Sequence, residues 1–356
     1  MKVKGLAFLA AAVLVLGISS VAYAITWGEE DLNGEYPNVV SVRGVVEATN
    51  TARYSCSGSL LNIDADKVVI LTAAHCTDSW IAAIGAGILN TVGVSFDQNN
   101  VINGSFSDAT HYVRGGVPIS FPAKDAPFEK FDYGLVVFAK TDVNFDGQTI
   151  ESRWGSIPGA LTPVQVSPDI EYLSDLISEY RKSRDDLKFT AVGYGTGEKF
   201  PIPGQETGPA DPAGSNDTTF PIRYYADNLS YSAHNPINDV LRLSMNIAKG
   251  ENGTCNGDSG GPIFYTDEDL GRVQVSLVSG GDAPCRATNT GPGFSRQEAQ
   301  DFVGCAFVAG DASAVQACVD GYFGGAEEAA SQAAVTNDQG NGTTQSLLML
   351  PLITRQ

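Results

Sequence analysis

The strongest chemical signal in this sequence is a serine inside a glycine-rich string. Residues 257–262 read Gly-Asp-Ser-Gly-Gly-Pro, which places the serine at position 259. A serine hydroxyl is a weak nucleophile until a neighbouring base removes its proton. Attack on an amide also creates an oxyanion, which needs donors held ready beside it, and glycines let backbone N–H groups converge there. The string therefore predicts a nucleophilic Ser259 rather than an incidental serine in a turn.

The candidate base is one of only three histidines in the chain. His75 ends the string Leu-Thr-Ala-Ala-His, follows an apolar run and precedes a cysteine. His111 and His234 lie in polar, loop-like surroundings without a comparable context. The alternative, a buried structural histidine, is less favoured once the serine string is present, and we interpret His75 as the general base.

The third candidate is an acidic residue at the start of an apolar strand. Asp132 opens the string Asp-Tyr-Gly-Leu-Val-Val-Phe. Burying a carboxylate is costly unless a partner compensates it. A histidine N–H is such a partner, and the carboxylate would then fix the tautomer and stabilise the imidazolium. On its own the string fits equally well with an aspartate that serves a turn.

The elements that must position these residues are predicted to be mostly strands. The chain has 356 residues, 43% of them hydrophobic and 39 of them glycine, as expected of a folded protein with many turns. Helical spacing is confined to residues 167–186 and 296–318. Short apolar runs separated by polar turns predict a barrel or sandwich, with strands near residues 39–45, 56–63, 67–72, 131–139, 189–194, 222–225, 240–247, 262–265 and 273–279.

The N-terminus is typical of an export signal. Lys2 and Lys4 precede an apolar stretch over residues 6–21, and Ala22 and Ala24 give a small-x-small cleavage pattern. We expect residues 1–24 to be a cleaved signal peptide, with an uncleaved membrane anchor as the alternative. Export would place the six cysteines in an oxidising compartment, where they tend to pair.

Together the three strings resemble the chymotrypsin/trypsin family of serine peptidases, whose chain order is also His, Asp, Ser. The resemblance spans about residues 25–305 and implies an all-β fold of two packed antiparallel six-stranded β-barrels with a C-terminal helix. We expect a peptidase domain over residues 25–325, divided near 160–186, and a low-complexity flexible tail over 326–356. The implied protein is a secreted (extracellular or periplasmic) serine endopeptidase that works through an acyl-enzyme.

The resemblance also implies a role for each motif residue. His75 takes the proton of Ser259, Asp132 holds His75, and the N–H groups of Gly257 and Ser259 form the oxyanion hole. The family pattern pairs the first two and the next two cysteines, which leaves the last two as a third bridge outside the family's common set. The implied disulfides are Cys56–Cys76, Cys255–Cys285 and Cys305–Cys318.

In the family, a freed isoleucine ammonium pairs with the aspartate before the nucleophile and so shapes the oxyanion hole. Cleavage after Ala24 would expose Ile25, which would pair with Asp258. Because signal cleavage would expose Ile25, we expect export itself to release an active enzyme. One departure from the family is that the segment reads Ile-Thr-Trp-Gly, where the family usually has Ile-Val-Gly-Gly.

The substrate pocket implied by the resemblance has no acidic residue at its base, where Gly253 stands. Without side chains on its walls, it would favour large apolar or aromatic substrate side chains. Asp282 at the rim offers an alternative preference for a cation. The implied pocket residues are Gly253, Thr254, Ser279, Gly281 and Gly293.

The composition argues against several partners. A formal net charge of −19 repels nucleic acid and anionic membranes. We expect peptide substrates, a monomer, no stable membrane span in the mature chain, and no cofactor or metal. Two rival interpretations remain: a non-catalytic homologue that uses the scaffold as a binding module, and an exported esterase.

Overall fold

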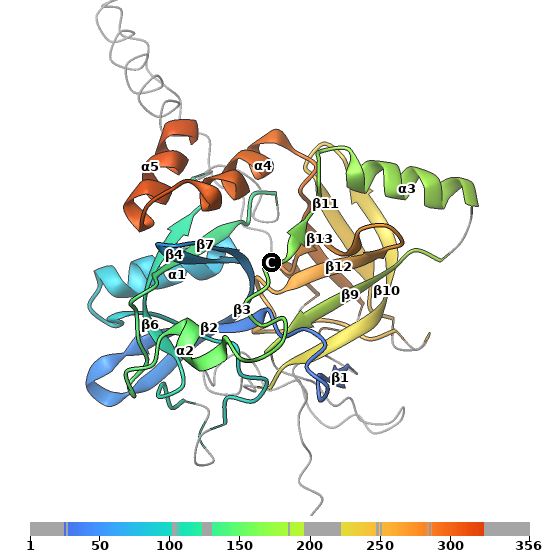
Figure 1. The fold of residues 1–356 in the computed structure, drawn as a ribbon. Coiled ribbons are helices and arrows are strands. Elements are labelled where there is room, and N and C mark those ends of the chain that lie inside the picture. The colour runs from blue at the N-terminus through green and yellow to red at the C-terminus, as the bar shows by residue number, and fades with distance from the viewer. Residues whose placement is uncertain are drawn as a thin grey trace, which may run out of the picture.

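The structure is a computed structural model. It describes residues 25, 28–101, 105, 107–122, 130–183, 186–195, 222–246, 249, 251–282, 285 and 287–323. The expected signal peptide (1–24) and tail (326–356) lie outside the described residues. Figure 1 shows two β units side by side, the first in blue to green and the second in green to orange.

The first unit is a closed barrel of six antiparallel strands. The apolar runs of the sequence form its wall, and every residue of β4 is buried. In order around the barrel the strands are β2 (Val39–Val46), β3 (Thr51–Ile63), β4 (Lys67–Thr72), β7 (Gly134–Ala139), β6 (Val113–Ser120) and β5 (Thr91–Ser95). The short helix η1 (Glu47–Thr49) connects β2 to β3.

A helix that the sequence did not predict follows β4 almost directly. α1 (Ala74–Gly85) begins after Ala73, whose side chain makes no capping hydrogen bond. Ser, Thr, Asp or Asn is the usual signal for a helix start, so nothing in the sequence marked this one. The helix is fixed by packing instead, since Trp80 is fully buried in the core of the first barrel.

The second unit is a nine-stranded sheet that curls back on itself. An antiparallel bridge between Ser276 and Gly293 joins the end of β13 to the chain after β15, so six of the nine strands form a second barrel. These six are β9 (Lys188–Gly193), β10 (Tyr224–Asn235), β11 (Val240–Ser244), β12 (Pro262–Asp267), β13 (Gly271–Leu277) and β15 (Thr288–Pro292). The other three are β1 (Glu29–Glu30), β8 (Gln165–Val166) and β14 (Gly280–Gly281).

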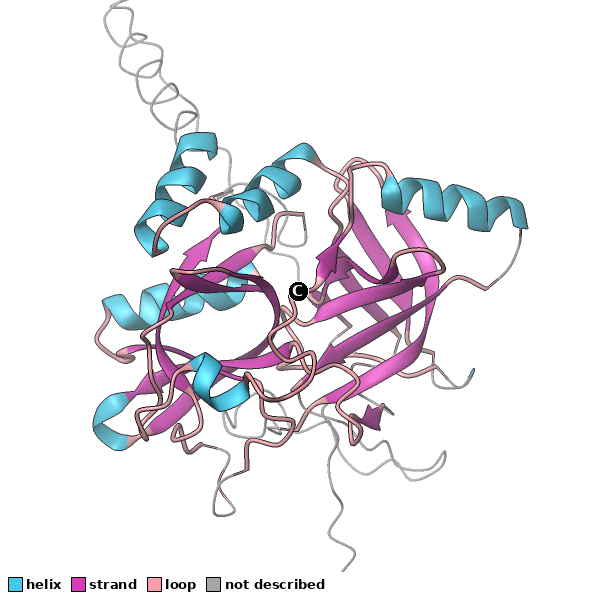
Figure 2. Ribbon diagram, viewed as in Figure 1, coloured by secondary structure: helices cyan, strands magenta, loops and turns pink. Residues whose placement is uncertain are grey.

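The helices confirm the remaining fold predictions. α3 (Tyr172–Ser183) falls within the predicted helical stretch between the barrels, and α2 (Ile150–Trp154) precedes it. The C-terminal stretch forms α4 (Gln297–Gly304), η3 (Cys305–Phe307) and α5 (Ala312–Phe323), which Figure 2 shows at the top of the view. The fold class is therefore confirmed as mostly β with a C-terminal helical segment.

The C-terminal helices follow the second barrel in sequence but pack on the first. Phe302 and Val315 are fully buried in the hydrophobic cluster of the first barrel. The ring of Phe121 packs between α4 and α5, with its centroid 5.3 Å from that of Phe302 and 4.7 Å from that of Phe323. The chain thus returns to its first half and ties the two barrels together.

A buried ion pair makes a second connection between the barrels. Arg223, just before β10, donates from Nε to Asp31 Oδ2 at 2.7 Å, and both side chains are at most 2% exposed. Its Nη1 also donates to the carbonyl of Val39 in the first barrel and to the hydroxyl of Tyr194. A buried pair is tolerated only when its remaining polar atoms are satisfied in this way.

Within the described residues, no helix has the length and apolar character that crossing a membrane requires.

Candidate active site

His75 and Asp132 are brought together by two neighbouring strand ends. Thr72 at the end of β4 pairs with Gly134 at the start of β7, so the chain after β4 lies beside the chain before β7. His75 is in the first turn of α1, and Asp132 lies two residues before β7. The carboxylate accepts from the backbone N–H of His75 at 2.8 Å and contacts its Nδ1 at 2.7 Å.

The geometry of this pair determines which ring nitrogen of the histidine is the basic one. A carboxylate only accepts, so Nδ1 carries the proton and Nε2 of His75 is the basic nitrogen. The hydroxyl of Ser279 donates a further hydrogen bond to Asp132 at 2.6 Å. The Asp132 side chain is 2% exposed and that of His75 is 27% exposed. The carboxylate is thus buried with its donors, while the imidazole stays accessible.

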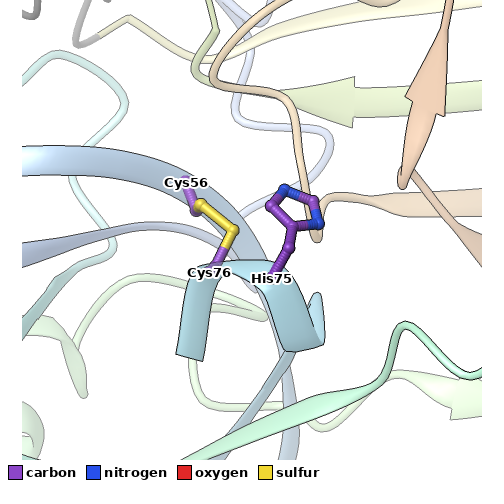
Figure 3. A group of neighbouring side chains, drawn as sticks. All are labelled: Cys56, His75 and Cys76. Carbon is purple, nitrogen blue, oxygen red and sulfur yellow. A yellow bond between two sulfur atoms is a disulfide. The ribbon is translucent and has the colours of Figure 1, made fainter. Parts of the chain in front are cut away.

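Ser259 lies on the loop before β12 and is held next to the histidine helix. Its carbonyl oxygen accepts from the backbone N–H of Ser57 at 2.8 Å and lies 3.9 Å from the Sγ of Cys76. Cys76 forms a disulfide with Cys56, the residue before Ser57. Figure 3 shows this disulfide beside the His75 ring. The bridge therefore fixes the residue after His75 to the strand that holds the carbonyl of the nucleophile.

The glycine that follows Ser259 allows the nucleophile loop to lie close to the backbone that precedes His75. Gly260 has a φ of +80°, and a Cβ there would lie 2.6 Å from the backbone nitrogen of Ala73. Only glycine tolerates both the positive φ and this contact. The residue after Ser259 therefore packs against the residue two before His75, and the side chain of Ser259 is half-buried at that contact.

Ser57, which the sequence did not single out, holds the proposed oxyanion loop. Its hydroxyl donates to the carbonyl of Gly257 at 3.0 Å and accepts from the backbone N–H of Tyr194 at 2.8 Å. Ser57 is fully buried, and Gly257 has a φ of +93°. One buried serine thus uses its backbone nitrogen and its hydroxyl to fix the backbone on both sides of residue 258. Its position after Cys56 was the only available signal.

Asp258 is fully buried directly before the candidate nucleophile. Its carboxyl accepts from the backbone N–H of Gly195 at 2.8 Å and of Cys255 at 2.9 Å. Burial raises the pKa of Asp258 well above its usual value, and the two hydrogen bonds oppose that shift. No cation pairs with Asp258 among the described residues. Ile25 is fully buried in the core cluster of the second barrel, and here its nitrogen is part of the peptide chain.

The structure gives the expected pocket glycines different immediate neighbours. A Cβ on Gly253 would lie 2.6 Å from the Cγ of Met245, whose Sδ accepts from the N–H of Thr254 at 3.1 Å. The N–H of Gly293 donates to the carbonyl of Asp239 at 2.7 Å. Gly293 lies at the bridge that closes the second barrel, where it pairs with Ser276.

Two further residues near the expected pocket have defined partners in the structure. The residue opposite Gly281 in the β14–β15 pair is Asn289, four residues before Gly293. Asp282, considered as an attractor for a substrate cation, accepts from the N–H groups of Ala287 and Thr288 at 2.9 and 2.7 Å.

The structure contains the three implied disulfides, Cys56–Cys76, Cys255–Cys285 and Cys305–Cys318. Potential ligand atoms of Cys56, His75 and Cys76 lie within 4.8 Å of one another, the one such cluster in the described part of the chain. Both sulfurs are consumed in a disulfide, so they offer no thiolate to a metal ion. The cluster is therefore the histidine and its supporting bridge.

Comparisons with known proteins show which of them the chain resembles. Residues 181–303 match the family model described as Trypsin. That segment includes the second barrel and the Ser259 string, so the resemblance to trypsin-like peptidases is confirmed there. Among curated proteins, no sequence matches the chain.

Solved structures give more distant matches. The protease Anisep from Arthrobacter nicotinovorans is 15% identical with a TM-score of 0.40, over 76% of this chain and 92% of its own. HL collagenase is 16% identical with a TM-score of 0.43, over 76% and 94%. The thermostable serine protease AL20 from an extremophilic microorganism is 16% identical with a TM-score of 0.40, over 73% and 93%. At these values, the function has to be argued from the site itself.

Proposed function

We propose that this protein is a serine endopeptidase in which His75, Asp132 and Ser259 form the catalytic triad. The observation that carries the proposal is the pair of hydrogen bonds from His75 to the buried Asp132. The His75–Asp132 pair lies beside the loop of Ser259, whose carbonyl accepts from the backbone N–H of Ser57. A base oriented by a buried carboxylate next to a serine on a glycine-rich turn is the arrangement that activates a hydroxyl.

The reaction would proceed in two halves. Nε2 of His75 takes the hydroxyl proton as Oγ of Ser259 bonds to the scissile carbonyl carbon, and the same proton then passes to the leaving amine. Water next attacks the acyl-enzyme, His75 takes a proton from that water, and the proton returns to Ser259 as the acid product leaves. The N–H groups of Gly257 and Ser259 would donate to the oxyanion in both halves.

The proposed activation step explains the environment of Asp258. A carboxyl that is buried without a cation is a costly group to retain unless a partner arrives. Signal cleavage after Ala24 would give Ile25 a free ammonium, and its insertion beside Asp258 would supply that charge. N-terminal sequencing of the exported protein tests this step: we expect Ile25 at position one, and a mature start well beyond it would exclude the ion pair.

The same proposal covers location and partners. We infer export to the extracellular space or periplasm, peptide substrates and a monomeric state. The three disulfides support an oxidising compartment. Fractionation of the producing cells, followed by sizing of the exported protein, tests location and oligomeric state.

Covalent labelling with a fluorophosphonate tests the catalytic function. We expect the probe to attach to Ser259 in the wild type and not in S259A, with a folded protein in both cases. A binding module would not label at all. An esterase would label but leave a folded-protein substrate uncut, so proteolysis of casein separates the remaining alternative.

A further inference from the structure

A buried amide bridges the two walls expected to enclose the substrate side chain. Asn289 is fully buried. Its Nδ2 donates to Oγ1 of Thr254, just before the nucleophile loop, and lies 3.5 Å from the carbonyl of Gly280 on the opposite wall. One side chain therefore spans the distance between these walls.

The register of the β14–β15 pair places this side chain in that position. Gly281 lies opposite Asn289, and Gly280 lies opposite Thr290. Side chains of directly opposed residues project from the same face of a sheet. Gly281 contributes no side chain to that face, so the side chain of Asn289 occupies the space there.

The polar atoms of this amide are only partly satisfied. Its Nδ2 has the partners just described, whereas Oδ1 of Asn289 is buried with no hydrogen-bond partner among the residues that the structure describes. Buried acceptors are normally paired, and an exception calls for a reason. A donor carried by a bound substrate would satisfy it. Thr254, the neighbour of the amide, is also buried, and its hydroxyl accepts from Nδ2 of Asn289, so a long substrate side chain between them would have to break this contact.

We propose that Asn289 is a specificity-determining residue, a conclusion that rests on the proposed peptidase function. It selects substrates with a short side chain before the scissile bond and favours a hydroxyl-bearing serine or threonine over alanine. Large aromatic and long cationic side chains are excluded, because they would have to displace the hydrogen bond between Asn289 and Thr254. This replaces the open apolar pocket expected from the glycines at 253, 281 and 293.

The test uses peptides that differ only in the residue before the scissile bond: alanine, serine, leucine, phenylalanine or lysine. We expect kcat/KM of the wild type for alanine and serine to exceed that for phenylalanine and lysine by at least about tenfold. N289G removes the bridge, and it should raise phenylalanine and lysine relative to alanine by about tenfold or more. N289L keeps the bulk without the amide, and it should keep the preference for short residues but lose that for serine over alanine.

N90G is the matched control, since Asn90 is an exposed asparagine on the first barrel. It should leave the order of substrates unchanged. Fluorophosphonate labelling counts competent sites in each variant, which separates specificity from misfolding. A wild type that labels and cleaves but prefers phenylalanine or lysine overturns the specificity proposal alone, as does an unchanged order in a labelling-competent N289G. A wild type that neither labels nor cleaves overturns the proposed function, and this inference with it.

Discussion

His75 and Asp132 in the first barrel lie at the ends of paired strands, whereas Ser259 in the second barrel lies on a loop held by contacts from elsewhere. The β4–β7 register fixes the first two residues, because Thr72 pairs with Gly134. Ser259 depends instead on Gly260, on the backbone of Ser57 and on the Cys56–Cys76 bridge. The proposed base is therefore part of the first barrel, while the proposed nucleophile is positioned against that barrel.

Loss of the Asp132 carboxylate should give the largest effect and test the first half of the comparison. D132N keeps the size of the side chain but can present a donor to Nδ1, which favours the wrong histidine tautomer. We expect kcat to fall about 10,000-fold, the magnitude that this change has in an enzyme with a Ser-His-Asp triad. Steady-state kinetics on a peptide substrate measures it.

D97N is the control for this prediction, since Asp97 also faces a histidine, with 3.3 Å between its Oδ2 and Nδ1 of His111. It should leave kcat within about twofold of the wild type, as a change outside the site does. Equal losses in D97N and D132N would contradict a special role for Asp132.

Removal of the Ser57 hydroxyl should test the second half. S57A leaves the carbonyl of Gly257 and the N–H of Tyr194 without their partner. Direct loss of an oxyanion donor costs about 100- to 1,000-fold in kcat, and loss of its support should cost less, about tenfold. We expect kcat to fall, KM to stay nearly constant, and binding of a peptide aldehyde, which mimics the oxyanion, to weaken with kcat.

S41A controls for the structural effect of losing a buried serine. The Ser41 hydroxyl is buried in β2 and bonds to Tyr112 at 2.9 Å. Both variants should lose about 1–3 kcal/mol in the free energy of unfolding, as expected for unsatisfied buried groups. Only S57A should weaken the aldehyde; a matching loss in S41A would mean that Ser57 acts through stability alone.

The disulfides sharpen the comparison further. Replacing either Cys56–Cys76 or Cys305–Cys318 by paired serines should lower the free energy of unfolding by about 2–4 kcal/mol. Only the first bridge holds the nucleophile loop against the histidine helix. At a temperature where both variants are folded, we expect lower activity in the first and near wild-type activity in the second. Equal activities would show that the bridge does not position the site.

The smallest expected effect concerns Asp258 and depends on the N-terminus. Burial raises the pKa of Asp258, so the folded chain binds a proton more readily than the unfolded chain. Its contribution to stability is complete at acidic pH and is lost as the pH rises above the usual range of an aspartate. In a chain that retains residues 1–24, D258N should therefore raise Tm at pH 8 by about 2–4 °C, the shift for about 1 kcal/mol in a domain of this size.

In the form that begins at Ile25, the sign should reverse. The ammonium would then compensate the carboxylate, so D258N should lower both Tm and activity. Thermal unfolding of both forms at pH 5 and pH 8 measures the four differences. The same sign in both forms would count against the ion pair.

The sequence predicted what short strings encode and missed what packing decides. The three motifs and the strand runs are local, so candidate residues and the β class were accessible. α1 was missed because Ala73 offers no capping signal. Asn289 was missed because its contact with Thr254 joins residues that are 35 positions apart in sequence. Ser57 carries no motif, and its role exists only once the barrels meet.

A double-mutant cycle on His75 and Ser259 tests the central claim most directly. Peptide-cleavage rates would be measured for the wild type, H75A, S259A and the variant with both changes. Residues that act as one catalytic unit are strongly non-additive. We predict that the double variant retains the same residual rate of peptide cleavage as either single variant. Independent, multiplying losses, or a single variant that stays active, would contradict it.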